Sequence, residues 1–365
     1  MQIQGSFLDR AETQMIRTLF FAAAAFFLSG PLSAESVPTG TESPLRVFVS
    51  AIVSQIGKVN DQAGNFEMTV DLQLRWRDPR LKFDAREHGS DRKAFLGDEA
   101  EAETKEIWTP QLVIRNMNGS PIRLEQAITI QSDGTVVHLQ RIKASFDTKF
   151  RLQAFPFDKQ ELPVRLISNK FNSNQIVLTQ DQTDKDTSGI KQGVGVSGFH
   201  LQKIAFSPGR ERGLNGEYFP TMDARVQIAR DPTSHIFTLF APFLALLVIP
   251  TVLTLFAKVD VAPRLTAWSA SILALIALNF TFSIRYPAVG ADGLINSVVS
   301  TGFGYQLLMV FISLIVLYPP VAEKITAKLG NKYVIAEVEK FMKWGIPVGL
   351  FALLISSVLL TMYTT

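Results

Sequence analysis

Hydrophobic and polar positions follow different patterns in the two parts of the chain. Up to Arg230, short stretches alternate between apolar and polar residues, most clearly from Phe66 to Trp76. Strict alternation puts one face of a strand in a core and the other in water, which predicts half-buried antiparallel strands. From Ile236 onward the pattern changes to long uncharged runs. The pattern therefore predicts a strand-rich domain followed by a helical one.

The predicted strands of the first part are short and bounded by turn residues. They cover residues 45–56, 66–76, 122–130, 135–142, 162–168, 176–179, 199–206 and 221–229. Short strands at this spacing are typical of a β-sandwich with an immunoglobulin-like arrangement. Residues 84–106 are charged and unpatterned apart from a short helix near Asp98, and residues 181–188 are expected to form a polar loop.

Four uncharged runs in the second part are each long enough to cross a bilayer. They predict membrane helices at about 236–257, 262–285, 294–318 and 344–363, within a transmembrane domain of residues 231–365. The segment 319–343 is rich in lysine, which predicts a cytoplasmic location. The sandwich domain, residues 35–230, and the C-terminus are therefore expected on the opposite side of the membrane.

An export signal is predicted for residues 1–34. Arg17 precedes the apolar run Thr18–Leu28, and Ala34 offers a small residue for cleavage before Glu35. The apolar run is too short to span a membrane as a fifth helix. This signal agrees with a sandwich domain outside the cytoplasm.

Composition narrows the classes of function. Of the 365 residues, 47% are hydrophobic and 19% charged, which disfavours a wholly soluble protein. The absence of cysteine excludes disulfides, thiol chemistry and cysteine metal sites. A net charge of +3 without clustered basic and aromatic residues gives no reason to expect a nucleic-acid partner.

Catalytic and cofactor motifs are not recognisable. The four histidines have no metal-ligand spacing. Gly193–Gly198 has the glycine spacing of a dinucleotide site, but no strand precedes it and no helix follows it, so a loop is favoured. We therefore expect no enzyme, no metal site and no cofactor.

The second membrane helix has two different faces. On a 3.6-residue helix, one face is mostly small or hydroxylated, while bulky residues gather on another. This slender face consists of Thr266, Ala270, Leu273, Ala277, Phe280, Thr281 and Ile284. It either lets the helix pack closely against its neighbours or faces a wet axis surrounded by several copies. In the second case Leu273 and Phe280 are apolar constrictions that gate by dewetting.

Three motifs resemble a known family. Phe155-Pro-Phe-Asp-Lys-Gln160 resembles the characteristic loop of the pentameric ligand-gated ion channels, also called Cys-loop receptors. Trp76-Arg-Asp-Pro-Arg-Leu81, and Trp108-Thr-Pro110 with Asn116, resemble two further motifs of that family and occur in the same order. The resemblance implies a homopentamer around a central pore, in which each chain has four identical partners. Agonist binding between subunits would open the pore to inorganic ions.

Further positions agree with this resemblance, which extends over residues 45–365. Leu273 lies nine residues after Arg264, as the family's gate leucine follows its basic residue. The two cysteine positions of the characteristic loop are Thr148 and Leu162, so the crosslink of animal receptors is absent. With the export signal, this points to the prokaryotic branch and to a bacterial inner membrane, where lipid surrounds the helices.

The resemblance implies that the two domains are coupled at the end of the sandwich nearest the membrane. The residues concerned are Asn60, Asp61, Phe155, Pro156, Phe157, Asp158, Arg230 and Pro287. A guanidinium near the membrane boundary is costly without a carboxylate, so Arg230 is expected to pair with Asp158 or Asp61. This pair either transmits gating or is a static structural ion pair.

The resemblance also implies an agonist site, which consists of Arg115, Asn169, Tyr218 and Phe219. An aromatic cage for a quaternary ammonium is largely missing, and Arg115 would repel such a cation. We therefore expect an agonist with a carboxylate or another anionic group, unless Arg115 instead bonds across the subunit contact. Protons are a second candidate agonist, because carboxylates and histidines are dispersed over the domain.

Charge selectivity depends on the cytoplasmic mouth of the pore, at Asp260, Ala262 and Pro263. Cation-selective members usually carry a glutamate ring here. Glutamate is absent, which argues against simple cation selectivity, while Asp260 is a candidate substitute. The alternative overall function is a non-conducting, membrane-anchored receptor, which predicts a monomer or dimer with a packed slender face.

Overall fold

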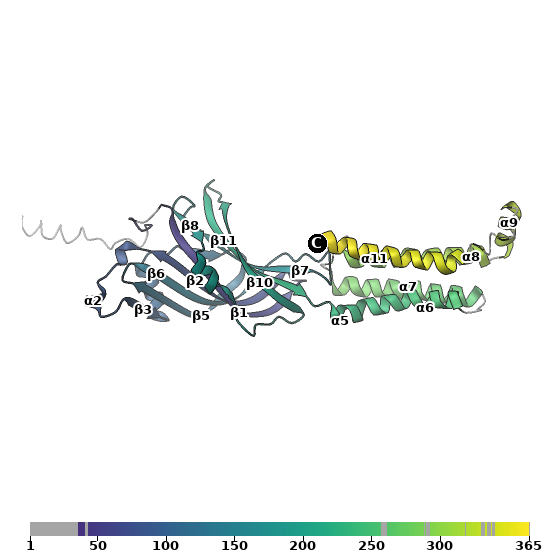
Figure 1. The fold of residues 1–365 in the computed structure, drawn as a ribbon, viewed down its shortest axis with the longest axis horizontal. Coiled ribbons are helices and arrows are strands. Elements are labelled where there is room, and N and C mark those ends of the chain that lie inside the picture. The colour runs from purple at the N-terminus through teal and green to yellow at the C-terminus, as the bar shows by residue number, and fades with distance from the viewer. Residues whose placement is uncertain are drawn as a thin grey trace, which may run out of the picture.

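The computed structural model describes residues 36–40, 43–256, 261–287, 289, 293–317, 319–329, 333, 337 and 340–364. The predicted export signal and Asp260 lie outside these residues. A strand-rich domain and a bundle of helices follow one another along the long axis of the molecule (Figure 1). The change of architecture occurs near Arg230, as the hydrophobic pattern predicts.

The first domain is a sandwich of a seven-stranded and a four-stranded sheet. The larger sheet contains β1 (Leu45–Asn60), β2 (Asn65–Arg77), β3 (Arg92–Leu96), β5 (Met117–Gln131), β6 (Thr135–Asp147), β8 (Ile176–Thr179) and β9 (Gly189–Ile190). The smaller sheet contains β4 (Leu112–Ile114), β7 (Lys159–Ser168), β10 (Phe199–Arg212) and β11 (Tyr218–Arg230). The strand orders are β3-β5-β6-β2-β1-β8, with β9 also paired to β1, and β10-β11-β7-β4.

The core of the sandwich lies between the two sheets. The alternation predicted for β2 is confirmed, because its even-numbered apolar residues from Phe66 to Trp76 are buried. They share one cluster with Leu162 and Val164 of β7 and with Val226 of β11. Burial of large apolar side chains is the main stabilising contribution of this cysteine-free domain.

The two tryptophan motifs build part of this core. The rings of Trp76 and Trp108 meet edge to face, with 5.9 Å between their centroids. The Asn116 side-chain amide donates to the carbonyls of Asp147 and Pro163, at 2.9 and 2.8 Å, and its oxygen accepts from the backbone N–H of Arg165. Asn116 thus connects the end of β6 with β7 through hydrogen bonds to their backbones.

Two segments differ from the expectation. Residues 181–188 are not a polar loop, because they contain the helix α4 (Gln182–Thr187), whose first turn has reciprocal hydrogen bonds between the side chains and backbones of Asp181 and Asp184. Residues 84–106 contain α2 (Ala85–His88) and the edge strand β3 in addition to the expected helix, α3 (Asp98–Glu106).

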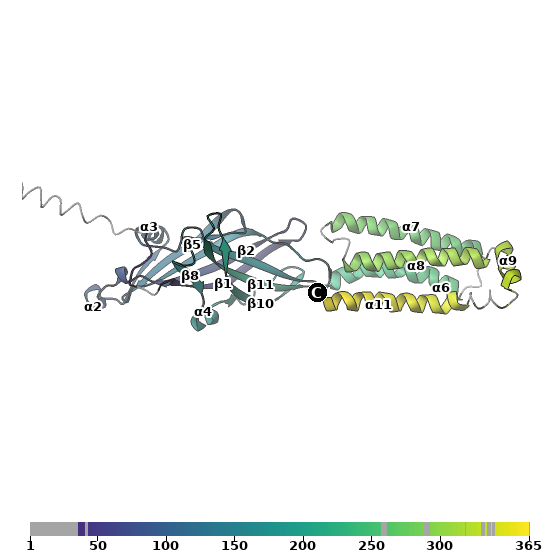
Figure 2. The ribbon, with the colours of Figure 1, turned by 90° about the horizontal axis from the view of Figure 1, so that it is seen from above.

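The second domain is built from long helices that run side by side in both views (Figures 1 and 2). After the short helix α5 (Thr233–His235) come the π-helix η2 (Ile236–Phe240), α6 (Ala241–Phe256), α7 (Val261–Arg285) and α8 (Leu294–Leu317). The π-helix η3 (Phe341–Gly345) and α11 (Ile346–Thr364) follow α9 (Pro319–Leu329). Figure 2 shows α9 at the end remote from the sandwich, whereas the C-terminal end of α11 lies near the sandwich.

Three helices in the described part of the chain are long and apolar enough to cross a membrane. They cover Ile236–Thr254, Ala262–Arg285 and Leu294–Leu314, and a shorter apolar helical stretch covers Ile346–Ser356. The three long segments agree with the first three predicted membrane helices to within a few residues, and the shorter stretch lies within the predicted fourth, 344–363.

A polar contact inside the bundle joins α6, α7 and α8. Pro250 has no N–H, so it cannot donate to the carbonyl of Leu246 one turn earlier. That carbonyl instead accepts from the Ser271 hydroxyl of α7 and, at 3.3 Å, from the Gln306 amide of α8. Gln306 also donates to Ser271 at 2.9 Å. Neighbouring helices thereby satisfy a backbone group that water would otherwise have to reach.

Candidate functional site

The two faces of α7 have opposite environments in the subunit. Every residue of the slender face is exposed, with Leu273 and Phe280 at 69% and 67%. On the opposite side, Trp268, Leu275 and Phe282 are buried. The Trp268 indole N–H donates to the Thr254 hydroxyl of α6 at 3.1 Å, which fixes the rotation of α7 about its axis.

The two threonines of the slender face keep oxygen lone pairs available to water. The Thr266 and Thr281 hydroxyls donate to the carbonyls of Ala262 and Ala277, at 2.9 Å in both cases. Ala262 and Pro263 are exposed at the beginning of the helix, whereas Arg264 is buried in the subunit. The third predicted selectivity residue, Asp260, lies outside the described residues.

Arg230 forms the centre of the junction between the domains. Its Nε lies 2.8 Å from Asp158 Oδ1, and one Nη lies 3.1 Å from Asp61 Oδ2, so both of the expected carboxylates are its partners. The guanidinium also stacks over the rings of Phe155 and Phe199, at 4.8 and 4.6 Å. A buried charge with two carboxylates and two ring faces is well compensated.

The loop after β6 contacts the outer ends of the helices. The ring of Phe155 lies 4.9 Å from that of Tyr286 and 6.4 Å from that of Phe282, measured between centroids. The backbone N–H of Leu294, at the beginning of α8, donates to the Gln153 carbonyl at 2.8 Å. Phe157 packs against the apolar core of the bundle. The loop therefore holds both helices that flank the α7–α8 connection.

The turn between β1 and β2 touches the same connection. The Gln62 side chain donates to the carbonyl of Arg285, the last residue of α7. The Asn60 side chain accepts from the backbone N–H of Ala63 and shapes this turn. Pro287 lies directly after Tyr286, and both line a cavity of about 250 Å³ at the outer ends of α7 and α8. Two loops of the sandwich thus meet the exit of α7.

An open cavity of about 250 Å³ lies on the sandwich, between the ends of β7 and β10. Three of the four predicted agonist residues line it, namely Arg115, Asn169 and Phe219. Tyr218 does not, and it is 54% exposed. Glu211, which no sequence motif singles out, also lines the cavity and lies 2.8 Å from the Arg115 guanidinium.

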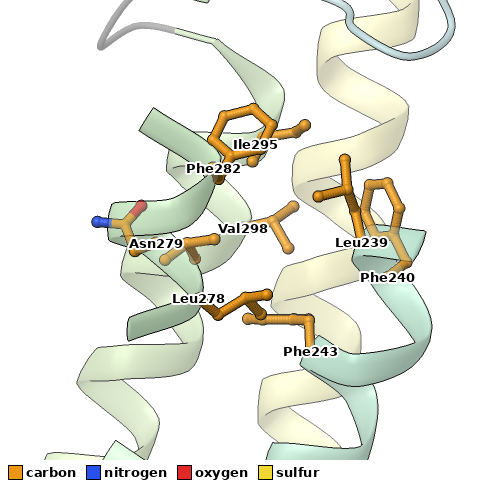
Figure 3. Close-up of a pocket in the computed structure, with 9 residues that line it drawn as sticks. Leu239, Phe240, Phe243, Leu278, Asn279, Phe282, Ile295 and Val298 are labelled. Carbon is orange, nitrogen blue, oxygen red and sulfur yellow. The ribbon is translucent and has the colours of Figure 1, made fainter. Parts of the chain in front are cut away.

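A small apolar cavity of about 30 Å³ lies inside the helical bundle, below the junction (Figure 3). Its walls are Leu239, Phe240, Phe243, Leu278, Asn279, Phe282, Ile295, Val298 and Val299. In Figure 3 the Asn279 amide points away from the other labelled side chains. The cavity lies between η2, α7 and α8, and Leu239 and Phe240 of η2 also pack in one apolar cluster with Phe282 of α7.

Comparison with known proteins agrees with this geometry. The family described as the neurotransmitter-gated ion-channel ligand binding domain matches residues 28–231, more than half of the chain. A proton-gated ion channel of Gloeobacter violaceus is 25% identical over 251 residues, which are 68% of this chain and 67% of that protein.

Animal proteins are also similar. The pH-sensitive chloride channel 2 of Anopheles gambiae is 27% identical over 280 residues, which are 73% of this chain and 44% of that protein. The gamma-aminobutyric acid receptor subunit alpha-2 of Rattus norvegicus is 21% identical over 255 residues, 68% of this chain and 54% of that protein. The chain spans about half the length of these animal relatives. With its sandwich, its apolar helices and the match over 28–231, the chain belongs to the pentameric ligand-gated ion channels.

Proposed function

We propose that five copies of this chain form an agonist-gated ion channel whose pore is lined by α7. The observation that supports this most directly is the exposure of the slender face in a helix whose other side is tightly packed. Lipid-covered helix faces are usually bulky and apolar, whereas this face carries two threonines and two alanines. Five such faces around an axis would enclose water.

The closed pore would be blocked at Leu273 and Phe280. Both side chains are mostly exposed in the subunit. Rings of leucine or phenylalanine offer no hydrogen bond to water, so a narrow passage at these levels dries and stops ions. Rotation or tilt of α7 by a few degrees would move these side chains away from the axis.

The junction would transmit agonist binding to α7. Arg230, Asp158 and Asp61 connect the end of β11 with the two sandwich loops that contact the α7–α8 connection. A displacement of β10 and β11 at the cavity would therefore reach α7 through packed groups and not through solvent. The remaining coupling residues are distributed over both sides of the junction. Asn60 ends β1, Phe155, Pro156 and Phe157 lie in the loop after β6, and Pro287 lies in the α7–α8 connection.

The agonist site would be the cavity with Arg115, Asn169, Phe219 and Glu211. An agonist with a carboxylate or another anionic group would bind Arg115 in place of Glu211. Protons are a second candidate agonist. This candidate is supported by the names of two relatives, a proton-gated channel and a pH-sensitive chloride channel. The family consists of ion channels, and we propose no enzymatic activity.

The proposed location is the bacterial inner membrane. The sandwich and the C-terminus would face away from the cytoplasm, after removal of residues 1–34. The exposed lysines Lys324, Lys328 and Lys340 would lie on the cytoplasmic side. Domain limits of 35–230 and 231–365 agree with the change from strands to helices near Arg230.

The test combines the number of subunits with electrical recording. Purified full-length protein is weighed by native mass spectrometry and then reconstituted in a planar bilayer. Protons are the probe, with the pH of the sandwich side lowered from about 7.5 to about 4.5. Pentamers with discrete currents support the channel. A monomer or dimer without conductance under any condition supports the membrane-anchored receptor instead.

A further inference from the structure

His235 lies where the two domains and the α7–α8 connection meet. It is the last residue of α5, directly before the first membrane helix. Its ring stands edge-on to Phe155, with 4.9 Å between the ring centroids. Its Nδ1 lies 3.3 Å from the hydroxyl oxygen of Tyr286, the residue that follows α7. One histidine thus bridges the sandwich loop, the first membrane helix and the exit of the pore helix.

The contact with Tyr286 can form with either tautomer of His235, because a tyrosine hydroxyl both donates and accepts hydrogen bonds. Imidazole donates from one nitrogen and accepts at the other only when it is neutral. Nδ1 accepts from the Tyr286 hydroxyl if the single ring proton is on Nε2. Protonation of Nδ1 reverses the direction of this hydrogen bond, and it places a full charge in a half-buried position near Arg230 and Arg285.

Charged groups on β11, on α7 and on both sandwich loops lie near His235. Arg230 at the end of β11 and Arg285 at the end of α7 oppose an imidazolium, and burial opposes it most. Asp158 and Asp61 favour an imidazolium, but both carboxylates already bind Arg230. Asp231 also interacts with His235 and is hydrogen-bonded to Thr233. Burial together with the two arginines holds the pKa of His235 below its ordinary value.

We propose that His235 is a proton-sensing residue that controls whether the α7–α8 connection is held against α5 and the sandwich. Protons favour the arrangement that binds them more tightly. An imidazolium is better solvated when water reaches the ring, so acidification favours an arrangement in which Tyr286 has separated from His235. This site is distinct from the agonist cavity beside Arg115. Its effect on the pore rests on the proposed channel function, whereas the movement itself does not.

A fluorescent label on the connection tests this movement without any current. Because the chain has no cysteine, Pro287→Cys introduces a single attachment site for an environment-sensitive dye. Emission of the purified full-length protein in lipid nanodiscs is followed from about pH 8 to about pH 4.5. We expect a sigmoidal change with its midpoint below about pH 6.5, the ordinary value for histidine.

The same titration on variants identifies the responsible group. His235→Gln keeps a hydrogen-bonding side chain that does not titrate, and should reduce the amplitude at least about fivefold. The matched control is His200→Gln on β10, whose side chain is exposed, and it should retain the amplitude. Tyr286→Phe keeps the ring without the hydroxyl and should also reduce the amplitude. An unchanged titration in both His235→Gln and Tyr286→Phe, or no change at all in the parent, overturns the proposal.

Bilayer recordings separate this proposal from the channel function. If the protein is a monomer or dimer without conductance but the fluorescence change depends on His235, the channel function fails and the proton-sensing residue stands. If the protein conducts and His235→Gln retains the full fluorescence change, the channel function stands and the sensor is refuted. In the conducting case, His235→Gln should also shift the pH of half-maximal current by at least about half a unit.

Discussion

At the scale of single residues, buried charged and titratable groups are the most informative. Arg230 and His138 are both almost inaccessible to solvent, but they are compensated differently. Arg230 keeps its charge because two carboxylates and two aromatic rings surround it. His138, on β6, forms a hydrogen bond with the Gln126 amide, at 3.1 Å, and is better kept neutral.

Replacing Arg230 with alanine should abolish opening. The change leaves Asp158 buried without its cation, which typically costs about 3–5 kcal/mol, and it disconnects β11 from the two sandwich loops. We expect pentamers at the membrane with at least about a hundredfold smaller acid-evoked current, measured together with the oligomer mass. Arg225→Ala, which removes a half-exposed cation from the same strand, is the matched control and should retain current. Full currents from Arg230→Ala would refute the coupling role.

Because His138 is buried, we expect the folded protein to lose stability in acid. Burial, and secondarily Arg123, lowers the pKa of His138 from 6.5 to about 4. As the pH falls, the unfolded chain therefore takes up the proton on His138 before the folded protein does. Neutral His138 makes its full contribution to the free energy of unfolding above about pH 6.5, and this contribution is lost as the pH falls toward about 4. The loss near pH 4.5 is about 2–3 kcal/mol.

Thermal unfolding of the parent and of His138→Gln checks this contribution. The two midpoints should be similar at about pH 7.5, and His138→Gln should unfold at a temperature several degrees higher relative to the parent at about pH 4.5. Parallel pH profiles for the two proteins would mean that His138 is not the group responsible.

At the scale of elements, α7 is oriented by its bulky side, which leaves the slender face exposed. Trp268 and Ser271 bond to α6, and Gln306 of α8 bonds to Ser271. Because these contacts fix the rotation of the helix, substitutions on the slender face should alter water in the pore without unfolding the subunit.

Leu273→Ser should ease opening. A hydroxyl at the constriction offers water a hydrogen bond and weakens dewetting. We expect spontaneous current near neutral pH, or half-maximal activation at an at least about tenfold lower proton concentration, recorded in bilayers. The same replacement at Leu253, an exposed leucine of α6, is the control and should not change activation. Unchanged spontaneous and acid-evoked conductance in Leu273→Ser would show that this position does not gate.

A helix or strand is predicted well from the sequence when only one of its faces is buried, because its apolar residues then recur at a regular spacing. β2 alternates because one face is buried, and α7 has two faces because one packs against α6 and α8. α4 has no apolar face, so its six polar residues give no period, and only the spacing of Asp181 and Asp184 indicates a capped turn. Glu211 was missed because the length of β10 follows from its pairing with β11, which a local pattern does not contain. The hydrogen bond from the Gln306 amide to the Leu246 carbonyl joins residues far apart in the sequence, so no local pattern predicts it.

At the scale of the whole molecule, a fivefold arrangement places five copies of every charged pore residue around the axis. Arg264 is buried in its own subunit, so its guanidinium is removed from the axis. Among the three predicted selectivity residues, only Asp260 carries a charge, and five copies would form a ring at the cytoplasmic mouth. We therefore expect a preference for cations, although the glutamate ring is absent.

Reversal potentials in asymmetric salt measure this preference. Asp260→Asn should move the reversal potential toward zero, because the ring loses its negative potential. Glu323→Gln removes an exposed carboxylate from α9, on the same side of the membrane, and should leave the reversal potential unchanged. A parent protein that selects anions, or an unaltered reversal potential in Asp260→Asn, would contradict the assignment.

The proline in the middle of α6 has a consequence for how the protein is made. The Leu246 carbonyl that Pro250 leaves free is satisfied by donors from two helices that are synthesised later. During synthesis, α6 therefore enters the membrane with an unmet backbone acceptor in its middle. Pairing of this carbonyl favours the association of α6 with α7 and α8 as soon as they are inserted, before any subunit meets another.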